Sequence, residues 1–276
     1  MTHAAVAATA AARLRALAAM ITRQAAEPSR PTSAPGSTLL HDLRVTCRRL
    51  ETCLRLWVPG AEARVTRLRL RTIRRAAGTA RELEVLVAML RARRLGAASV
   101  PEPLRESWLK RLARAAAAAN VGALPTSRVA ERVQARIERL ALVLERGHAP
   151  RARARERLRR WRRVARARLT AAIASGEPAA LHRARLALKR WRYAEEAAAA
   201  VADGRSREPQ VPLRRWQRSL GALNDRAALI AFASAAGPPG RRLVPLLEAQ
   251  RLAAVRALRR RRDAGVTPSR AHSRRP

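Results

Sequence analysis

The chain has 276 residues, a length that fits one large domain or two domains of about 140 residues each. Its formal net charge is +39, because 59 Lys and Arg residues stand against 20 Asp and Glu residues, and only Lys110 and Lys189 are lysines. An excess this large predicts an anionic partner, which would be a polyphosphate, a nucleic acid or an acidic membrane surface.

Composition disfavours several other classes of protein. Aromatic residues make up only 3% of the chain, which is unfavourable for the base stacking that holds single-stranded nucleic acids. Cys47 and Cys53 point about 120° apart on one predicted helix, so we expect reduced thiols of a cytoplasmic protein. No apolar run approaches the roughly 20 residues of a membrane span. Arg13 and Arg15 interrupt the alanine-rich N-terminus, so we expect a first helix there and not a signal peptide.

Hydrophobic periodicity, together with glycines and prolines, divides the chain into helices, and no stretch has the alternation of a strand. The predicted fold is therefore all-α, with helix lengths that suit four-helix bundles. The predicted helices are 4–26, 38–57, 61–95, 104–120, 127–146, 151–174, 179–202, 213–236 and a last one from after 240 to about 263. The predicted loops are 27–37, 96–103, 121–125, 147–150, 176–178, 204–212 and 237–240, and the tail 264–276 is expected to be disordered. We expect Ser37 or Thr38 to cap the second helix, and Ser127 the fifth.

The second predicted helix carries a row of cations along one side. Residues 41–57 read HDLRVTCRRLETCLRLW, in which His41 is followed by Arg44, Arg48 and Arg49. Its other side is apolar, with Leu43, Cys47, Leu50, Leu54 and Trp57. A row of long cations suits a polyanion with regularly spaced charges and has no use for a neutral ligand.

The seventh predicted helix repeats this row 141 residues later. Residues 181–196 read LHRARLALKRWRYAEE, in which His182, Arg185, Lys189 and Arg190 stand where the first row has its histidine and arginines. At 100° per residue, His182, Arg185, Lys189 and Tyr193 fall within about 80° of one another. Ala184, Leu188 and Trp191 lie on the opposite side. Two matches of this length on amphipathic helices indicate two similar halves.

A glycine follows each row inside the next long helical pattern. Gly78 comes 37 residues after His41, and Gly221 comes 39 residues after His182. Glycine inside a helix costs about 1 kcal/mol relative to alanine, so we expect a close backbone approach at each one. The pairs Arg81–Glu82 and Asn224–Asp225 follow these glycines, and we expect their acids to orient neighbouring arginines. Arginines that share a helix face with the glycines are Arg64, Arg67, Arg71, Arg74 and Arg81 in the first half, and Arg214 and Arg218 in the second.

These motifs resemble those of the CHAD family, the conserved-histidine α-helical domain, over roughly residues 5–263. The matching segments are His41-x-x-Arg44-x-x-x-Arg48-Arg49-Leu50, Gly78-x-x-Arg81-Glu82, His182-x-x-Arg185-x-x-x-Lys189-Arg190-x-Arg192-Tyr193 and Leu220-Gly221-x-x-Asn224-Asp225. The chain departs from the family where residues 81–84 read Arg-Glu-x-Glu in place of Arg-Asp-x-Asp, and at Ala184 and Trp191.

The resemblance implies one domain of two helical bundles related by a pseudo-twofold, with halves at about 5–146 and 151–263. It also implies a basic central groove that binds inorganic polyphosphate. The residues expected to bind it are His41, Arg44, Arg48, Arg49, Arg67, Arg71, Arg74, Arg81, His182, Arg185, Lys189, Arg190, Arg192, Tyr193, Arg214, Arg218 and Asn224. Arginines of the 151–174 helix, such as Arg153 and Arg157, are expected to lie outside this set.

Other interpretations of the same residues remain open. Any single arginine is more readily a solvated surface residue, and GC-rich coding is an equal explanation of the preference for Arg over Lys. Phosphate-backbone binding of nucleic acid is the main alternative, and cleavage of phosphoanhydrides through His182 is a lesser one. No metal-binding histidine pair and no Gly-rich phosphate loop accompany the cations, so we expect no catalytic residue, no metal and no cofactor. We expect a cytoplasmic protein associated with polyphosphate granules.

Overall fold

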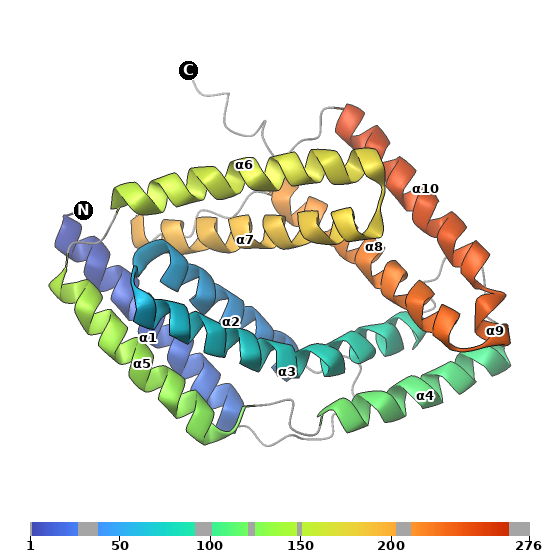
Figure 1. The fold of residues 1–276 in the computed structure, drawn as a ribbon, viewed down its shortest axis with the longest axis horizontal. Coiled ribbons are helices and arrows are strands. Elements are labelled where there is room, and N and C mark those ends of the chain that lie inside the picture. Colours follow the sequence, from blue (N-terminus) through green and yellow to red (C-terminus); the bar gives the residue numbers. More distant parts are fainter. Residues whose placement is uncertain are drawn as a thin grey trace. The chain divides into compact units, whose positions relative to one another are not determined.

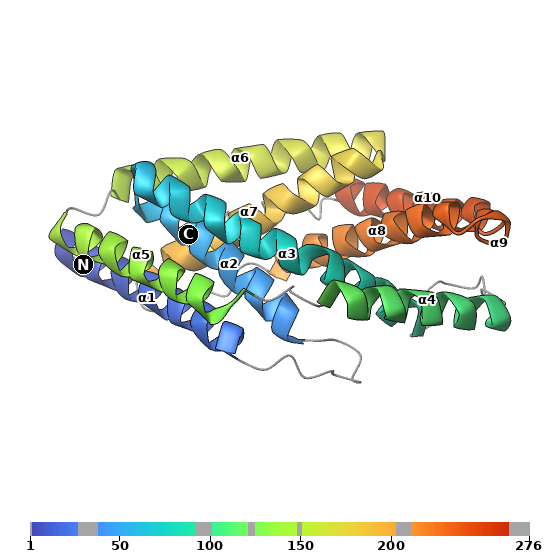
Figure 2. The ribbon, with the colours of Figure 1, turned by 60° about the horizontal axis from the view of Figure 1, so that its bottom comes forward.

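A computed structural model of the protein describes residues 2–26, 38–91, 101–120, 125–147, 151–202 and 211–264. Ten helices and no strand occur in these ranges, so the predicted all-α fold is confirmed (Figures 1 and 2). The helices are α1 (His3–Ala26), α2 (Thr38–Trp57), α3 (Ala61–Arg91), α4 (Glu102–Asn120), α5 (Ser127–Arg146), α6 (Arg151–Ser175), α7 (Pro178–Ala202), α8 (Val211–Ala235), α9 (Pro238–Arg241) and α10 (Val244–Asp263).

The predicted helix ends are wrong in a few places. Thr126, and not Ser127, caps α5, because its Oγ1 accepts the N–H of Val129 at 3.4 Å. Pro103 and Pro212 lie in the first turns of α4 and α8 and not in loops. Proline is tolerated there because the backbone N–H that it lacks has no hydrogen-bond partner in the first turn of a helix. The break predicted at 237–240 contains the short helix α9. The predictions for 27–37, 92–100, 121–124, 148–150, 203–210 and the tail from 265 lie outside the described residues.

The helices pack into two compact units, each built from segments that are distant in sequence. Unit 1 consists of Met1–Ala88, Lys110–Leu158 and Tyr193–Arg207, and unit 2 of Met89–Leu109, Arg159–Arg192 and Glu208–Pro276. Each unit therefore takes segments from both sequence halves. The halves at 5–146 and 151–263, and their pseudo-twofold relation, stay predictions about the repeated sequence.

In unit 1, α1 packs lengthwise on α5 and also contacts α2 (Figure 1). The fully buried Leu14, Leu17 and Ile21 of α1 provide the apolar side of this packing. Arg15 on the same helix forms ion pairs with Glu138 and Glu145 of α5 at 2.9 and 2.5 Å. Apolar packing and the two ion pairs of Arg15 thus hold α5 beside α1.

Helix α1 is also long and apolar enough, by length and composition, to cross a membrane, which differs from the expectation of no such segment. Core helices of soluble proteins are also this long and apolar, so length and composition do not distinguish a membrane span from a core helix. In this structure α1 buries one side, which includes Val6, Ala10 and Leu14, inside unit 1.

In unit 2, the core is formed around the indoles of Trp191 and Trp216, which are both fully buried. Trp108 and Phe232 meet edge to face, with ring centroids 5.5 Å apart. Helix α10 packs against α8 (Figure 2). Arg259 of α10 donates from Nε to the carbonyl oxygen of Ile173 at 2.9 Å, which satisfies one of the carbonyls that the end of α6 leaves unbonded.

Candidate anion-binding site

The predicted division of α2 into a cationic and an apolar side is confirmed in unit 1. The apolar side chains Leu43, Cys47, Leu50, Leu54 and Trp57 are all buried, the last with 6% of its surface exposed. The cationic residues of the same helix are half-buried or exposed, namely His41, Arg44, Arg48 and Arg49. The amphipathic pattern therefore separates a buried apolar side from a less buried cationic side.

Arg44 lies across the backbone of α3 at Gly78. Its Nη1 donates to the carbonyl oxygen of Arg74 at 3.3 Å. A Cβ built at Gly78 would stand 3.0 Å from the same nitrogen, which is closer than such atoms ordinarily approach. The expected close approach at Gly78 is thus present, and it is made by the guanidinium of the row.

Arg185 and Gly221 repeat this arrangement in unit 2. A Cβ at Gly221 would stand 3.7 Å from Nε of Arg185 and 4.0 Å from its Nη2. These are ordinary van der Waals distances, so the approach is looser than at Gly78. Both units nevertheless place the arginine three residues after the histidine over a glycine of the following long helix.

Glu51 holds three arginines of unit 1 in place, although its sequence position does not predict this role. Its carboxylate accepts hydrogen bonds from Arg71 at 2.9 Å and Arg55 at 3.0 Å, and lies 3.9 Å from Arg74. Burial alone would raise the pKa of this carboxyl, but the bonds from Arg71 and Arg55 outweigh burial and hold that pKa below its usual value. One acid therefore positions three arginines and leaves an excess of positive charge.

The structure also places Arg157 of α6 beside this cluster, although its membership of the binding set, from which the sequence excludes it, stays untested. Its Nη1 donates to the carbonyl oxygen of Arg55. Burial lowers the pKa of the Arg67 guanidinium, and the nearby charges of Arg55, Arg71 and Arg157 lower it further. Such crowding of like charges destabilises the protein without a ligand and favours the binding of an anion. We call His41, Arg44, Arg48, Arg55, Arg67, Arg71 and Arg74 the unit 1 face.

In unit 2, a hydrogen bond joins the histidine of the second row to α8. Nδ1 of His182 donates to Oδ1 of Asn224 at 2.5 Å, which leaves Nε2 as the ring nitrogen for an outside partner. The role expected for Asp225, to orient an arginine, stays a prediction. Nε2 of Gln217 donates to the carbonyl oxygen of Leu188 at 3.0 Å and ties α8 to α7. We call His182, Arg185, Lys189, Arg214, Arg218 and Asn224 the unit 2 face.

Three further arginines of unit 2 stack on buried indoles and were not predicted as site residues. Arg162 and Arg166 of α6 lie over Trp191 at 5.7 and 5.9 Å from the ring centroid, and Arg261 of α10 lies over Trp216 at 5.0 Å. Burial lowers the pKa of the Arg261 guanidinium, and the charges of Arg215 and Arg218 on α8 lower it further. These arginines are fixed by packing and enlarge the positive field of unit 2.

Several predicted site residues lie elsewhere or have other partners. Tyr193 is 4% exposed and belongs to the core of unit 1. Arg49 pairs with Glu196 at 3.3 Å and not with the Glu51 cluster. Arg81 pairs with Glu84 at 3.2 Å, so the orienting acid is Glu84 and not the exposed Glu82. Arg190 is exposed and Arg192 is half-buried.

Within the described ranges, no group of three or more His, Cys, Asp or Glu side chains gathers as a metal site. The two faces therefore offer guanidinium, ammonium and imidazole groups, which donate hydrogen bonds to oxyanions.

The comparisons with known proteins place this arrangement in a family. The model of the CHAD domain matches residues 16–234. A crystal structure of the CHAD domain from the plant Ricinus communis has the same fold, with a TM-score of 0.65 and 21% sequence identity. The alignment covers 98% of this chain and 92% of that one. No curated protein matches the chain. The family model covers well over half of the sequence, and the chain belongs to the CHAD domain family.

Proposed function

We propose that the chain binds inorganic polyphosphate through the unit 1 face and the unit 2 face. The observation that carries this proposal is the repeated placement of an arginine over a glycine, Arg44 over Gly78 and Arg185 over Gly221, within a cationic surface. A repeated cationic surface suits a ligand with regularly repeated anionic groups. The polyphosphate binding implied by the resemblance to the CHAD family points to the same ligand.

The chemistry of the two faces suits successive phosphate groups. Guanidinium groups offer paired donors that bridge phosphate oxygens, and Lys189 adds a compact point charge. Arg71 and Arg74 are held in place by Glu51, so less side-chain freedom remains to be lost on binding. A bound polyanion would also relieve the repulsion around Arg67.

The aromatic residues favour polyphosphate over nucleic acid. All five Trp, the one Tyr and the one Phe lie in the described ranges, and none of them is exposed. Protein surfaces that bind single-stranded nucleic acid use exposed aromatic rings on which bases stack. The exposed side chains therefore favour contacts with phosphate groups over stacking with bases.

Competition tests the proposal directly. Long-chain polyphosphate should displace DNA or RNA from the chain at equal phosphate concentration, and neither nucleic acid should displace polyphosphate. The logarithm of affinity should fall linearly and steeply with the logarithm of salt concentration, by the counterion argument made for nucleic acids. Displacement in the opposite direction would favour nucleic acid, and a slope near zero would exclude a polyanion ligand.

We further propose that binding proceeds without cleavage and that the chain accompanies polyphosphate granules in the cytoplasm. The faces supply cations that stabilise a bound polyanion by charge and by hydrogen bonds. Incubation with polyphosphate should release no orthophosphate above the rate without protein. Release that depends on His182 would instead support the phosphoanhydride-cleaving alternative.

A further inference from the structure

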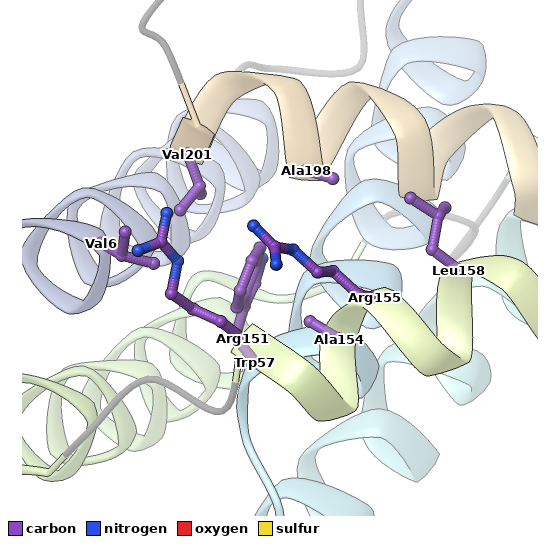
Figure 3. Close-up of a pocket in the computed structure, with 8 residues that line it drawn as sticks. All are labelled: Val6, Trp57, Arg151, Ala154, Arg155, Leu158, Ala198 and Val201. Atoms are coloured by element: carbon purple, nitrogen blue, oxygen red, sulfur yellow. The ribbon is translucent and has the colours of Figure 1, made fainter. Parts of the chain in front are cut away.

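A cavity of about 100 Å³ lies in unit 1, among α1, α2, the start of α6 and the end of α7 (Figure 3). Its apolar wall is formed by Val6, Leu158 and Val201, together with Ala154 and Ala198. The cavity is partly enclosed, and its volume is about three times the share of one molecule in liquid water. It can therefore hold an aliphatic group of a few carbon atoms.

Trp57 gives this apolar cavity an unused hydrogen-bond donor. The residue lines the cavity and is 6% exposed. Its Nε1–H is buried and has no hydrogen-bond partner among the described residues. Buried polar groups are ordinarily bonded, so this donor favours an occupant that presents an oxygen atom.

Two positively charged groups line the cavity. Among the described residues that line it, Arg151 and Arg155 carry the charge, and Figure 3 shows their guanidinium groups projecting on either side of the Trp57 indole. Both belong to the first two turns of α6, where the helix dipole adds positive potential. The cavity thus combines an aliphatic wall, a buried N–H donor and two guanidinium groups.

We propose that this cavity is a second ligand site, which takes a short aliphatic carboxylate. The carboxylate would accept hydrogen bonds from Trp57 and the two arginines, and the aliphatic chain would cover Val6, Leu158 and Val201. A polyphosphate chain has no apolar part to place against that wall. This site does not depend on the proposed function, because none of its residues belongs to the unit 1 face.

Calorimetric titration with acetate, butyrate and hexanoate tests the site. Each methylene that enters an apolar cavity should tighten binding about fourfold, until the cavity is full. Ala198→Leu should fill the cavity and abolish the dependence on chain length. Trp57→Phe keeps a ring but removes the N–H, and should weaken butyrate binding about threefold to tenfold. Arg151→Gln with Arg155→Gln should weaken all three carboxylates.

The matched control is Arg128→Gln with Arg132→Gln, two exposed arginines of α5 in the same unit. It should leave carboxylate binding unchanged. Equal affinities for acetate and hexanoate, or wild-type hexanoate binding by Ala198→Leu, would overturn the proposal and leave only charge attraction to a basic surface. Thermal unfolding of each variant identifies those that remain folded, and Ala198→Leu and Trp57→Phe test independent parts of the site.

Discussion

At the scale of single residues, Glu51 is the acid on which the unit 1 face depends. Its folded-state pKa is lower than the usual 4.5, so the stability it contributes is fully present above the unfolded-state pKa. That stability is lost as the pH falls through the folded-state pKa. Glu51→Gln should lower the free energy of unfolding by about 1–3 kcal/mol at neutral pH, because the mutation removes the acceptor of charged donors.

Denaturant unfolding from neutral pH down to below the usual pKa of the carboxyl measures this effect. The difference between Glu51→Gln and the wild type should shrink as the solution becomes acidic. Glu131→Gln, at an exposed position of α5, should change stability by no more than about 0.5 kcal/mol. A difference that does not depend on pH would mean that Glu51 acts through its shape and not through its charge.

The two cysteines give a second prediction at this scale. Burial raises the pKa of the Cys47 and Cys53 thiols to about 12, so neither forms a thiolate at neutral pH in the folded protein. An aromatic disulfide reagent should therefore label them only as fast as the protein opens, and polyphosphate should slow that labelling. Rapid labelling of the native protein would contradict the burial of these thiols.

Helical periodicity places residues on a side of a helix but does not show what covers that side. Tyr193 shares a sector of α7 with His182 and Lys189, which predicts a site residue. In the last turns of α7 this side of the helix instead packs in the core of unit 1, where Tyr193, Ala197 and Val201 are all buried. The pairing of Glu51 with Arg71 is not predicted for the same reason, since it joins residues 20 positions apart on two different helices.

At the scale of elements, the two glycines predict gains in stability of different size on replacement by alanine. Replacing a helical glycine with alanine stabilises the helix by about 1 kcal/mol. Gly221→Ala should gain this stability, because the new Cβ would lie at an ordinary contact distance from Arg185. Gly78→Ala should gain less, because Arg44 must move away from the new Cβ.

Chemical denaturation and polyphosphate titration of both variants check this contrast. Gly78→Ala should weaken polyphosphate binding more than Gly221→Ala does, since it displaces an arginine of the proposed site. If the two variants behave alike, the close approach of Arg44 to α3 has no role in binding.

The sequence predicts the helices and the positions of both rows because each depends on local spacing. It does not predict that Arg157 of α6 contacts Arg55 of the unit 1 face, or that Arg162 and Arg166 stack on Trp191, because these contacts arise only through packing. The long cationic pattern of α6 looks like a solvated surface when it is considered alone. The arginines that contact other helices are distinguished only by the neighbours that the fold provides.

At the scale of the whole molecule, a net charge of +39 makes folding and ligand binding parts of one equilibrium. A ligand that binds only the folded state stabilises it by about 2.7 kcal/mol at a hundredfold excess over Kd. Thermal unfolding should therefore shift clearly upward with long-chain polyphosphate, and much less with the same phosphate supplied as orthophosphate. Equal shifts would show that separate ions suffice and that no extended surface is recognised.

The last prediction concerns the two faces together. Arg44→Ala with Arg48→Ala should weaken the binding of long polyphosphate, and so should Arg185→Ala with Lys189→Ala. Each charge-assisted contact contributes at most about 1.5–3 kcal/mol, and less where water screens it, so each pair should lose about tenfold or more in affinity. A short polyphosphate that engages one face should respond mainly to one pair. A long one should respond to both, because covalent linkage raises the effective concentration of its second segment.

The control for this experiment must avoid α6, because Arg157 contacts Arg55 of the unit 1 face. Arg128→Ala with Arg132→Ala on α5 removes the same charge from exposed positions and should cost severalfold less than either pair. Arg157→Ala should have an effect between that control and the pairs. If the α5 control weakens binding as much as the face variants do, affinity follows total charge, and the two faces are not specific sites.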